Sequence, residues 1–433
     1  MQKQGQVRVW KSDALPADWF KRQKADEKAA QEVDCSVKAI INQVKANGDG
    51  ALVEFALKFD KAELNLRTLK VKAGEIKEAY NKTSPEQVFA LKFMKEKVNA
   101  YQKQLLTQTE IKTTGDGISV QTVLRPIESV GCYVPGGQAA YPSTLVMTAV
   151  PAKVAGVPRI VVCSPSDAKG KVNPLVLVAA DICGVDEVYR VGGAQAIAAL
   201  AYGTKTIKPV RKIVGPGSKY VTAAKVLVSM DVAIDMPAGP SEVLVLADES
   251  ADARLIAFDM VSQAEHGGDS VAGLITTSER VALQVQENLA KIAASAERGE
   301  KVSEALCKYG FIIICKSIDE AVGLVNQFAP EHLEVMTANA KELAEKLTAG
   351  LILIGPYSPV ALSDYGSGTN HVLPTGGFAQ SFSGLSAFDF TRRLSIVESS
   401  RTGLERVKDS IKVMTEAENL PNHYKAIKAR FEK

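Results

Sequence analysis

The chain has 433 residues, of which 46% are hydrophobic, and this is enough to bury a substantial core in two or three domains. Its 52 Lys and Arg residues nearly balance 49 Asp and Glu residues, and the formal charge of +3 is too small for the basic surface that nucleic acids or anionic membranes attract. The first residues lack a signal-peptide pattern, and no stretch approaches the roughly 18 apolar residues of a membrane helix. We therefore expect a cytoplasmic protein that acts on a small molecule.

The first part of the chain, residues 1–115, has the pattern of a helical scaffold. Apolar residues recur at helical spacing between residues 26 and 50, and a Gly turn follows them. At Ser84, a capping residue is followed by Pro85 at the first helical position and by Gln87 three residues on, which predicts the start of another long helix. We expect this helical region to pack on an α/β core.

From about residue 120 the sequence alternates short β-branched runs with segments of helical length. The first runs are RIVVCS, EVYRVGG and KIVGPG, and the pattern resumes after AGPSE with VLVLAD, AGLITT, FIIICK and LILIG. This order predicts parallel strands joined by right-handed helical crossovers, in two α/β units at residues 116–238 and 239–375. Ligands in such folds bind in crevices beyond the carboxyl ends of the strands, so motifs at those ends carry the most weight.

The tail, residues 376–433, differs from the alternating region before it. A stretch rich in Phe, Ser and Gly leads into a predicted helix, a break at Leu420-Pro421 and a short basic helix. We expect a separate arm.

The four histidines of the chain lie beside polar residues of the kinds found in active sites. Gln263 and His266 are three residues apart at a predicted helix end, so they project from one helical face and can offer an amide oxygen and an imidazole to one ion. Asp364 and His371 lie in a Gly-rich stretch after a predicted strand and add a carboxylate and a further polar contact. Taken separately, a solvated helix end and a surface turn would also explain these patterns.

Glu331 and His332 are adjacent and point in different directions, so they suit two successive roles. An imidazole can serve as a base near neutral pH, and a carboxylate can activate water; an exposed helix start is the alternative. Glu418 and His423 flank the Pro break of the tail, where a solvated pair would be ordinary. Two imidazoles, a carboxylate and an amide would form a tetrahedral zinc site, with manganese or cobalt as substitutes, but their spacing does not establish that they meet.

Glycine turns and one cysteine complete the candidate groups. The turns VPGG (134–137), VGGAQ (191–195) and GPGSKY (215–220) follow predicted strands, but none forms the GxGxxG fingerprint of dinucleotide-binding folds. Cys132 beside the first turn is a possible nucleophile, although no neighbouring histidine is available in sequence to activate it. The residues alone therefore predict an α/β metalloenzyme with glycine loops at strand ends.

Longer motifs resemble the histidinol dehydrogenase family. They are IDMPAGPSEV (234–243), continued by DMVSQAEH (259–266), then SVGCYVPGG, VGGAQAIAALAYGT, FAPEHLE and DYGSGTNHVLPT, and the likeness spans nearly the whole chain after about residue 30. The resemblance implies two Rossmann-like parallel-sheet units in an aldehyde-dehydrogenase-like arrangement. It also implies oxidation of L-histidinol to L-histidine through an aldehyde, by two hydride transfers to NAD, as the last steps of histidine biosynthesis.

The resemblance assigns roles to single residues. It implies that one Zn²⁺ per subunit is held by Gln263, His266, Asp364 and His423 and anchors the imidazole and amine of the substrate. By the same carry-over, His332 takes the alcohol proton, Glu331 activates the water that adds to the aldehyde, and the substrate pocket is completed by Ser241, His371 and Glu418.

The resemblance also places NAD against Tyr133, Gln195 and Ser218. The family usually has Asn in a GPGN sequence at the third position, so this departure puts the contact of Ser218 in doubt. Family members are homodimers whose C-terminal arm crosses to the partner, so Glu418 and His423 would serve the site of the other subunit.

Three other functions are compatible with parts of the pattern. A related dehydrogenase of the same fold could oxidise another small polar alcohol, but Glu418 and His423 argue against it, and a comparison of amino alcohol substrates would decide. A zinc hydrolase, in which Glu331 activates metal-bound water, would not bind NAD saturably. A non-catalytic metal-binding or scaffolding protein would leave the clustered polar motifs unexplained.

Overall fold

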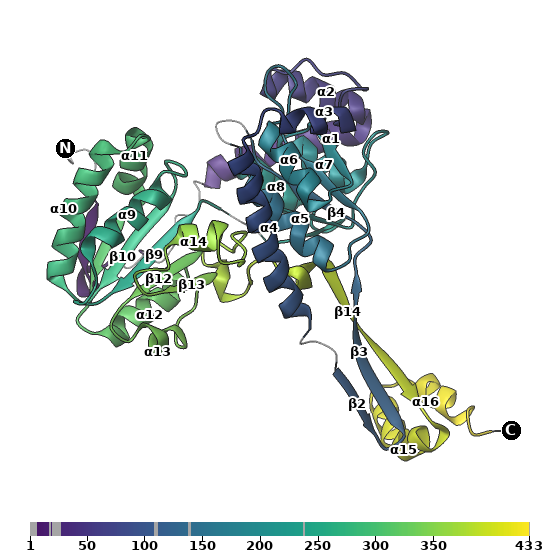
Figure 1. Cartoon of the computed structure of the whole chain (residues 1–433). Coiled ribbons are helices and arrows are strands. Elements are labelled where there is room, and N and C mark those ends of the chain that lie inside the picture. Colours follow the sequence, from purple (N-terminus) through teal and green to yellow (C-terminus); the bar gives the residue numbers. More distant parts are fainter. Residues whose placement is uncertain are drawn as a thin grey trace.

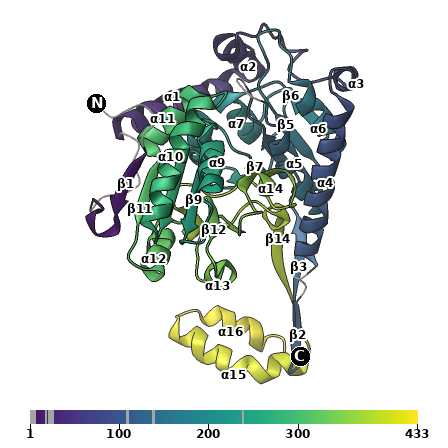
Figure 2. The ribbon, with the colours of Figure 1, turned by 60° about the vertical axis from the view of Figure 1, so that its left-hand side comes forward.

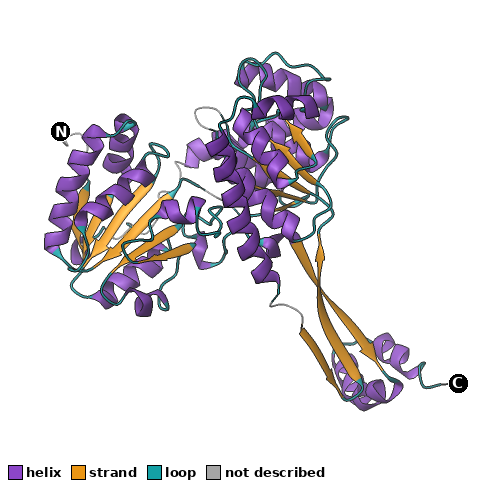
Figure 3. Ribbon diagram, in the orientation of Figure 1, coloured by secondary structure: helices purple, strands orange, loops and turns teal. Residues whose placement is uncertain are grey.

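The computed structural model describes residues 7–16, 19, 27–107, 111–136, 140–236 and 239–432. Gly137 of the predicted VPGG turn, and Pro237 and Ala238 of the family-like stretch, lie outside these described residues. Two α/β units lie beside each other, and a long arm extends away from one of them (Figure 1). Each unit has a central sheet with helices over it (Figure 3). Within the described ranges, no helix is long and apolar enough to cross a membrane.

The first unit is built on a five-stranded parallel sheet in the order β6-β5-β4-β7-β8. Its strands are β4 (Val130–Tyr133), β5 (Ile160–Cys163), β6 (Glu187–Tyr189), β7 (Lys212–Val214) and β8 (Ala233–Ile234). One face is covered by α1 (Glu27–Asn47), α2 (Asp49–Phe55), α7 (Gly193–Tyr202) and α8 (Lys219–Val228). The other face is covered by α3 (Ala73–Tyr80), α4 (Pro85–Leu106), α5 (Pro142–Val154) and α6 (Pro174–Cys183).

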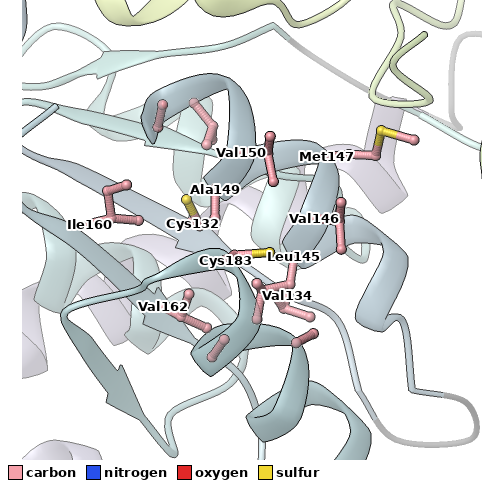
Figure 4. Close-up of a cluster of buried hydrophobic side chains, with 14 of the residues drawn as sticks. Cys132, Val134, Leu145, Val146, Met147, Ala149, Val150, Ile160, Val162 and Cys183 are labelled. Carbon is pink, nitrogen blue, oxygen red and sulfur yellow. The ribbon is translucent and has the colours of Figure 1, made fainter. Parts of the chain in front are cut away.

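The strands of this sheet are apolar on both faces because helices cover both. Figure 4 shows the cluster between the sheet and α5 and α6, in which Cys132 of β4 and Cys183 of α6 lie among aliphatic side chains. The alternation of strands and helices predicted from the sequence is confirmed here.

Helix α4 begins as the sequence predicts. The Ser84 Oγ accepts a hydrogen bond from the backbone N–H of Gln87 at 3.2 Å, and the side chain of Gln87 accepts one from the backbone N–H of Ser84 at 3.0 Å. Two donors that the helix leaves without partners are thereby satisfied, and Pro85 occupies the first turn, where its missing N–H costs nothing.

The second unit contains a six-stranded parallel sheet in the order β1-β11-β10-β9-β12-β13. Its strands are β1 (Arg8–Lys11), β9 (Glu242–Ala247), β10 (Val271–Thr276), β11 (Phe311–Ile314), β12 (His332–Met336) and β13 (Leu351–Ile354). Helices α9 (Ala253–Ala264), α10 (Glu279–Ser295), α11 (Gly299–Tyr309) and α14 (Val360–Tyr365) contribute to the core on one face, and α12 (Ile318–Phe328) and α13 (Ala340–Ala344) to the core on the other. The edge strand β1 (RVWK) was not predicted, because two of its four residues are charged and it therefore lacks the apolar run of its neighbours.

The arm is a three-stranded antiparallel ribbon that carries two helices. The ribbon has the order β14-β3-β2 and consists of β2 (Ile111–Gly115), β3 (Ile118–Pro126) and β14 (Thr391–Ser399). Helices α15 (Arg401–Ala417) and α16 (Pro421–Lys428) follow it, with the predicted break between them. Seen from a second direction, they remain apart from both units (Figure 2). The short remaining helical turns are Ser12–Ala14, Ala56–Asp60, Phe378–Gln380 and Ala387–Phe390.

Candidate active site

A cavity of about 780 Å³ lies between the two α/β units. Its size is that of a site for a small molecule or a cofactor. Residues predicted from the sequence that line it are Ser218, Ser241, Gln263, His266, Glu331, His332, Asp364 and His371. The fold therefore brings together polar groups from segments far apart in the sequence, whereas Tyr133, Gln195, Glu418 and His423 are not part of its wall.

The two sheets present opposite edges to this cavity. In the first unit, Pro135 follows β4 and Ser218 follows β7, so the carboxyl ends of the strands face the cavity. In the second unit, Ser241 precedes β9 and His332 begins β12, so the amino ends face it. In the second unit the candidate residues therefore lie at the amino ends of the strands and not at the carboxyl ends, where motifs were expected to matter most. The reason is that α9 and α14 end at the amino ends of the strands and carry candidate residues there.

Glu331 is held in place by backbone and side-chain contacts with Glu242. The Glu331 Oε2 accepts a hydrogen bond from the backbone N–H of Glu242 at 2.7 Å, and the backbone N–H of Glu331 donates to the Glu242 Oε2 at 3.2 Å. Glu242 Oε1 accepts a third bond from the backbone N–H of Gly376 at 3.1 Å. Sequence analysis did not single out Glu242, although it lies within the AGPSEV motif, and these contacts fix the carboxylate of its buried neighbour.

His332 is oriented by a backbone carbonyl. Its Nδ1 lies 3.2 Å from the carbonyl oxygen of Glu242 and 3.6 Å from the Glu331 Oε2. Since a carbonyl only accepts, this contact requires the proton on Nδ1 and leaves the lone pair on Nε2. Nε2 is buried, has no hydrogen-bond partner among the described residues, and lies 3.9 Å from the Asp364 Oδ1. This geometry suits a base.

Nearby negative charges oppose the effect of burial on the pKa of His332. Burial lowers the pKa of His332, but Glu331 and Asp364 together raise it above its ordinary value. For Asp364 itself, burial dominates and raises its pKa to about 6. The site therefore contains groups that can exchange protons near neutral pH.

The other two histidines of the cavity are kept neutral. Burial lowers the pKa of His371 to about 4 and also lowers that of His266, which leaves their imidazoles free to bind a cation or accept a hydrogen bond. The His371 Nδ1 lies 3.9 Å from the Asp364 Oδ1, an oxygen that is buried without a hydrogen-bond partner in the described part of the chain.

The described part of this chain brings together fewer candidate ligands than a tetrahedral zinc site requires. Within the described ranges, no three His, Cys, Asp or Glu residues are close enough to form a metal site. His266, Asp364 and the amide of Gln263 share the cavity and are the N and O donors that zinc accepts, and the oxygen of Asp364 that lacks a donor suits a cation. A tetrahedral zinc site would need a fourth ligand from outside these three residues.

The three residues expected to contact NAD differ in accessibility. Tyr133 is buried, and its hydroxyl accepts a hydrogen bond from the backbone N–H of Gly193 at 3.0 Å. Gln195 is buried behind the same turn, where a Cβ on Gly193 would meet its side chain at 2.6 Å. Ser218 is exposed to the cavity and caps α8 without a side-chain hydrogen bond to the helix, so its hydroxyl is available.

Glu418 and His423 lie on the arm. Glu418 follows the last residue of α15 and His423 belongs to α16, and both side chains are exposed. The arm extends away from the α/β units in both views (Figures 1 and 2), and neither residue lines the cavity. A single chain therefore does not bring these two residues to its own cavity.

Cys132 cannot serve as the nucleophile that its sequence context suggested. Its side chain is completely buried in the cluster of Figure 4, and burial raises its pKa to about 12. A thiol in this state has almost no thiolate and no access to substrate.

Comparison with known proteins identifies the family. The family model described as histidinol dehydrogenase matches residues 21–431. The histidinol dehydrogenase of Clostridium acetobutylicum is 46% identical over 401 residues, covering 92% of this chain and 93% of the relative. That of Methanosarcina mazei is 43% identical over 402 residues, covering 92% of each chain.

A solved structure agrees with the sequence comparison. The crystal structure of histidinol dehydrogenase from Elizabethkingia anophelis has a TM-score of 0.92 and 35% identity, covering 100% of this chain and 99% of that one. Both sheets, the cavity between them and the arm belong to the region covered. The chain therefore belongs to the histidinol dehydrogenase family.

Proposed function

We propose that this protein oxidises L-histidinol to L-histidine through histidinaldehyde, with two NAD as hydride acceptors. The observation that carries this proposal is the shared cavity, in which the base candidate His332 and the carboxylate Glu331 lie beside Gln263, His266 and Asp364. A four-electron oxidation needs both a base for the alcohol and a group that activates water for the aldehyde. The cavity supplies both.

His332 and Glu331 divide the proton chemistry. The Nε2 of His332 takes the proton of the alcohol as the first hydride leaves, because its other nitrogen is committed to the Glu242 carbonyl. Glu331 then removes a proton from the water that adds to the aldehyde before the second hydride leaves. Its carboxylate is held by the Glu242 backbone N–H at 2.7 Å, so it reaches the same place in each turnover.

A zinc ion fits the donors of the cavity. We assign Gln263, His266 and Asp364 as its ligands, and the partner subunit's His423 as the fourth. The ion would supply an anchor for the imidazole and amine of the substrate. Ser241 and His371, which line the cavity, would contact the substrate from the same chain, and the partner subunit's Glu418 would do so from the arm.

NAD is assigned to the sheet of the first unit, which lies within residues 116–238. In an open parallel sheet, dinucleotides bind at the carboxyl ends of the two neighbouring strands where the strand order reverses. Here these two strands are β4 and β7. A second cavity of about 420 Å³ lies against the ends of β4 and β5 and shares Pro135 with the first cavity. The cofactor can therefore extend from the second cavity, past the shared Pro135, to Ser218 beside the substrate.

We propose a homodimer in which the two helices of the arm, which lie within residues 376–433, reach the cavity of the partner, while residues 239–375 supply the rest of the metal and substrate site. The helices and ribbon of the arm expose many large apolar side chains. The surfaces of monomeric proteins seldom expose so many of them together. These side chains are Ile111, Val120, Leu394, Ile396, Val397, Val413, Met414 and Leu420. A twofold exchange of arms would cover these side chains and complete both sites.

The test is the stoichiometry of the reaction with and without a chelator. Purified protein given L-histidinol and excess NAD should yield two NADH and one histidine for each histidinol consumed, and a chelator should abolish the reaction until Zn²⁺ is restored. Release of free aldehyde with one NADH per histidinol would refute the proposed four-electron reaction.

A further inference from the structure

A pair of acidic side chains lies beneath the cavity, outside the residues used above. Glu334 of β12 is 1% exposed, and its Oε1 accepts a hydrogen bond from the backbone N–H of Val360 at 3.0 Å. Its Oε2 is buried and has no hydrogen-bond donor among the described residues. The carboxyl group that approaches it within hydrogen-bonding range belongs to Asp259 of α9. Two groups that only accept when ionised therefore face each other.

Glu334 and Asp259 each lie on the same element as a site residue and on the same face of that element, but farther from the cavity. On β12, Glu334 is two residues from His332 and shares its face of the sheet. On α9, Asp259 precedes Gln263 by four residues and therefore lies on the same helical face.

Helix α14 also has a residue of this contact one turn from a site residue. On α14, Val360 precedes Asp364 by four residues, so its N–H is one helical turn below the carboxylate. The three elements that carry Gln263, His332 and Asp364 thus meet at one junction.

We propose that Asp259 and Glu334 share a single proton and act as positioning residues, tying α9, β12 and α14 together so that the site residues above them keep their spacing. The proton gives the Glu334 Oε2 the partner that it lacks. If both groups were ionised, two like charges would be buried in contact.

Electrostatics agree with this geometry. Burial raises the pKa of Glu334 well above its usual range, with Asp259 adding to the effect, and burial raises the pKa of Asp259 to about 6. Both shifts favour a carboxyl group that keeps its proton, as a shared proton requires. No described cation neutralises either group.

The first test uses substitutions that keep or break the contact. Glu334→Gln keeps it, because the amide oxygen can accept from Val360 and the NH₂ group can donate to Asp259. Asp259→Ala removes the contact from the less buried partner, where the loss of a side chain is less harmful to folding than at Glu334. Measured by competition with a chelator, zinc affinity should stay within about threefold of the wild type for Glu334→Gln and fall about 10- to 100-fold for Asp259→Ala, the range typical when support behind metal ligands is lost.

A matched control separates positioning from general weakening of α9. Asp252 caps the other end of this helix by accepting from the backbone N–H of Arg254 at 2.8 Å. Asp252→Ala should lower the stability of the protein but leave zinc affinity unchanged. An equal loss of affinity in Asp252→Ala and Asp259→Ala would overturn the positioning role.

The zinc measurement rests on the proposed function, so a second measurement uses metal-free protein. At pH 8 the carboxyl groups of Asp60 and Asp364, with pKa values of about 6, are ionised. Infrared spectra should then contain the band of one protonated carboxyl that shifts in D₂O and is absent from Glu334→Gln. Absence of this band from the wild type would refute the shared proton. If the band is present but the wild type binds no zinc, the metal assignment fails instead.

Discussion

The two walls of the cavity have opposite electrostatic character, because the two sheets turn opposite edges toward it. In the first unit, helices follow strands at the facing edge, so α5 and α8 begin beside the cavity and expose backbone N–H groups. In the second unit, α9 and α14 end there and expose carbonyl groups. A helix carries partial positive charge at its amino end and partial negative charge at its carboxyl end.

This difference explains how one cavity can hold unlike ligands. The wall with helix amino ends and glycine turns suits the phosphates of a dinucleotide. The wall with helix carboxyl ends and the carboxylates Glu331 and Asp364 suits a metal ion and the ammonium group of an amino alcohol. In the proposed reaction, hydride transfer between the ligands would take place where the walls meet, so changes on one wall should leave binding to the other intact.

The largest effect should come from the chemistry of the second wall. Glu331→Gln keeps an oxygen that can accept from the Glu242 backbone N–H, but it removes the carboxylate that activates water. We expect oxidation of histidinaldehyde to slow by about 10²- to 10⁴-fold, with a smaller effect on the first hydride transfer. Single-turnover absorbance of NADH measures the two steps separately.

The same variant tests the independence of the walls. Its Kd for NAD, measured by calorimetry, should match that of the wild type. A large change in this Kd, or equal slowing of both hydride transfers, would contradict the division of roles.

Mixing two inactive variants should test the sharing of sites between subunits. His423→Ala removes a ligand on the arm, and Glu331→Gln damages the body of the chain. In a heterodimer, one site receives both changes and the other receives neither. After full exchange of equal amounts, we expect about a quarter of the wild-type activity, because half of the dimers are mixed and each has one intact site.

Subunit exchange must be verified in that experiment by mass spectrometry of differently tagged chains. Mixed dimers with no more activity than the parent variants would show that the arm does not complete the partner's site.

A smaller effect should follow from loosening the first wall. Lys225 and Asp235 form a buried ion pair, and both hold Gly215: Lys225 Nζ donates to its carbonyl at 3.0 Å, and Asp235 accepts from its N–H at 2.8 Å. Lys225→Met leaves Asp235 without its cation and should destabilise the protein by about 3–5 kcal/mol, as measured by urea unfolding.

That substitution also sharpens the comparison of the walls. Since Gly215 begins the turn that ends at Ser218, the Kd for NAD should rise while zinc affinity stays unchanged. Loss of zinc binding in a folded Lys225→Met protein would indicate that the walls are coupled.

The smallest expected change concerns the departure from the family sequence at Ser218. Its hydroxyl is uncommitted, and Ser218→Asn would place a longer polar side chain at the same helix start. We expect the KM for NAD to fall by about two- to fivefold, which corresponds to one modest hydrogen bond, with the KM for histidinol unchanged. A higher KM for NAD would mean that the serine is adapted to a different contact.

Local patterns predicted the elements well but not their assembly. The capping box at Ser84, the strand-helix alternation and the break at Leu420-Pro421 follow from interactions within a few residues, so the sequence reveals them. Strand β1 pairs with β11, and β3 pairs with β14, across most of the chain. Pairing over such distances leaves little local signal, and neither the edge strand nor the ribbon was predicted.

The site was predictable only in part for the same reason. Spacing placed Gln263 and His266 on one face, but their meeting with Asp364 was expected from family resemblance alone. Hydrophobic periodicity predicts whether a segment is a helix or a strand, but not which end of a strand lies at a cavity. The position of His332 at the amino end of β12 was therefore missed. Glu242 was missed because it acts through the orientation of Glu331 and His332, a contact visible only in three dimensions.

The most direct test of this account is anomalous diffraction at the zinc edge from crystals of the zinc-loaded dimer. We predict one peak per subunit, bound by Gln263, His266 and Asp364 of one chain and by the partner subunit's His423, on the wall formed by the second sheet. A peak on the wall of the first sheet, or one bound without the arm of the partner, would contradict the account.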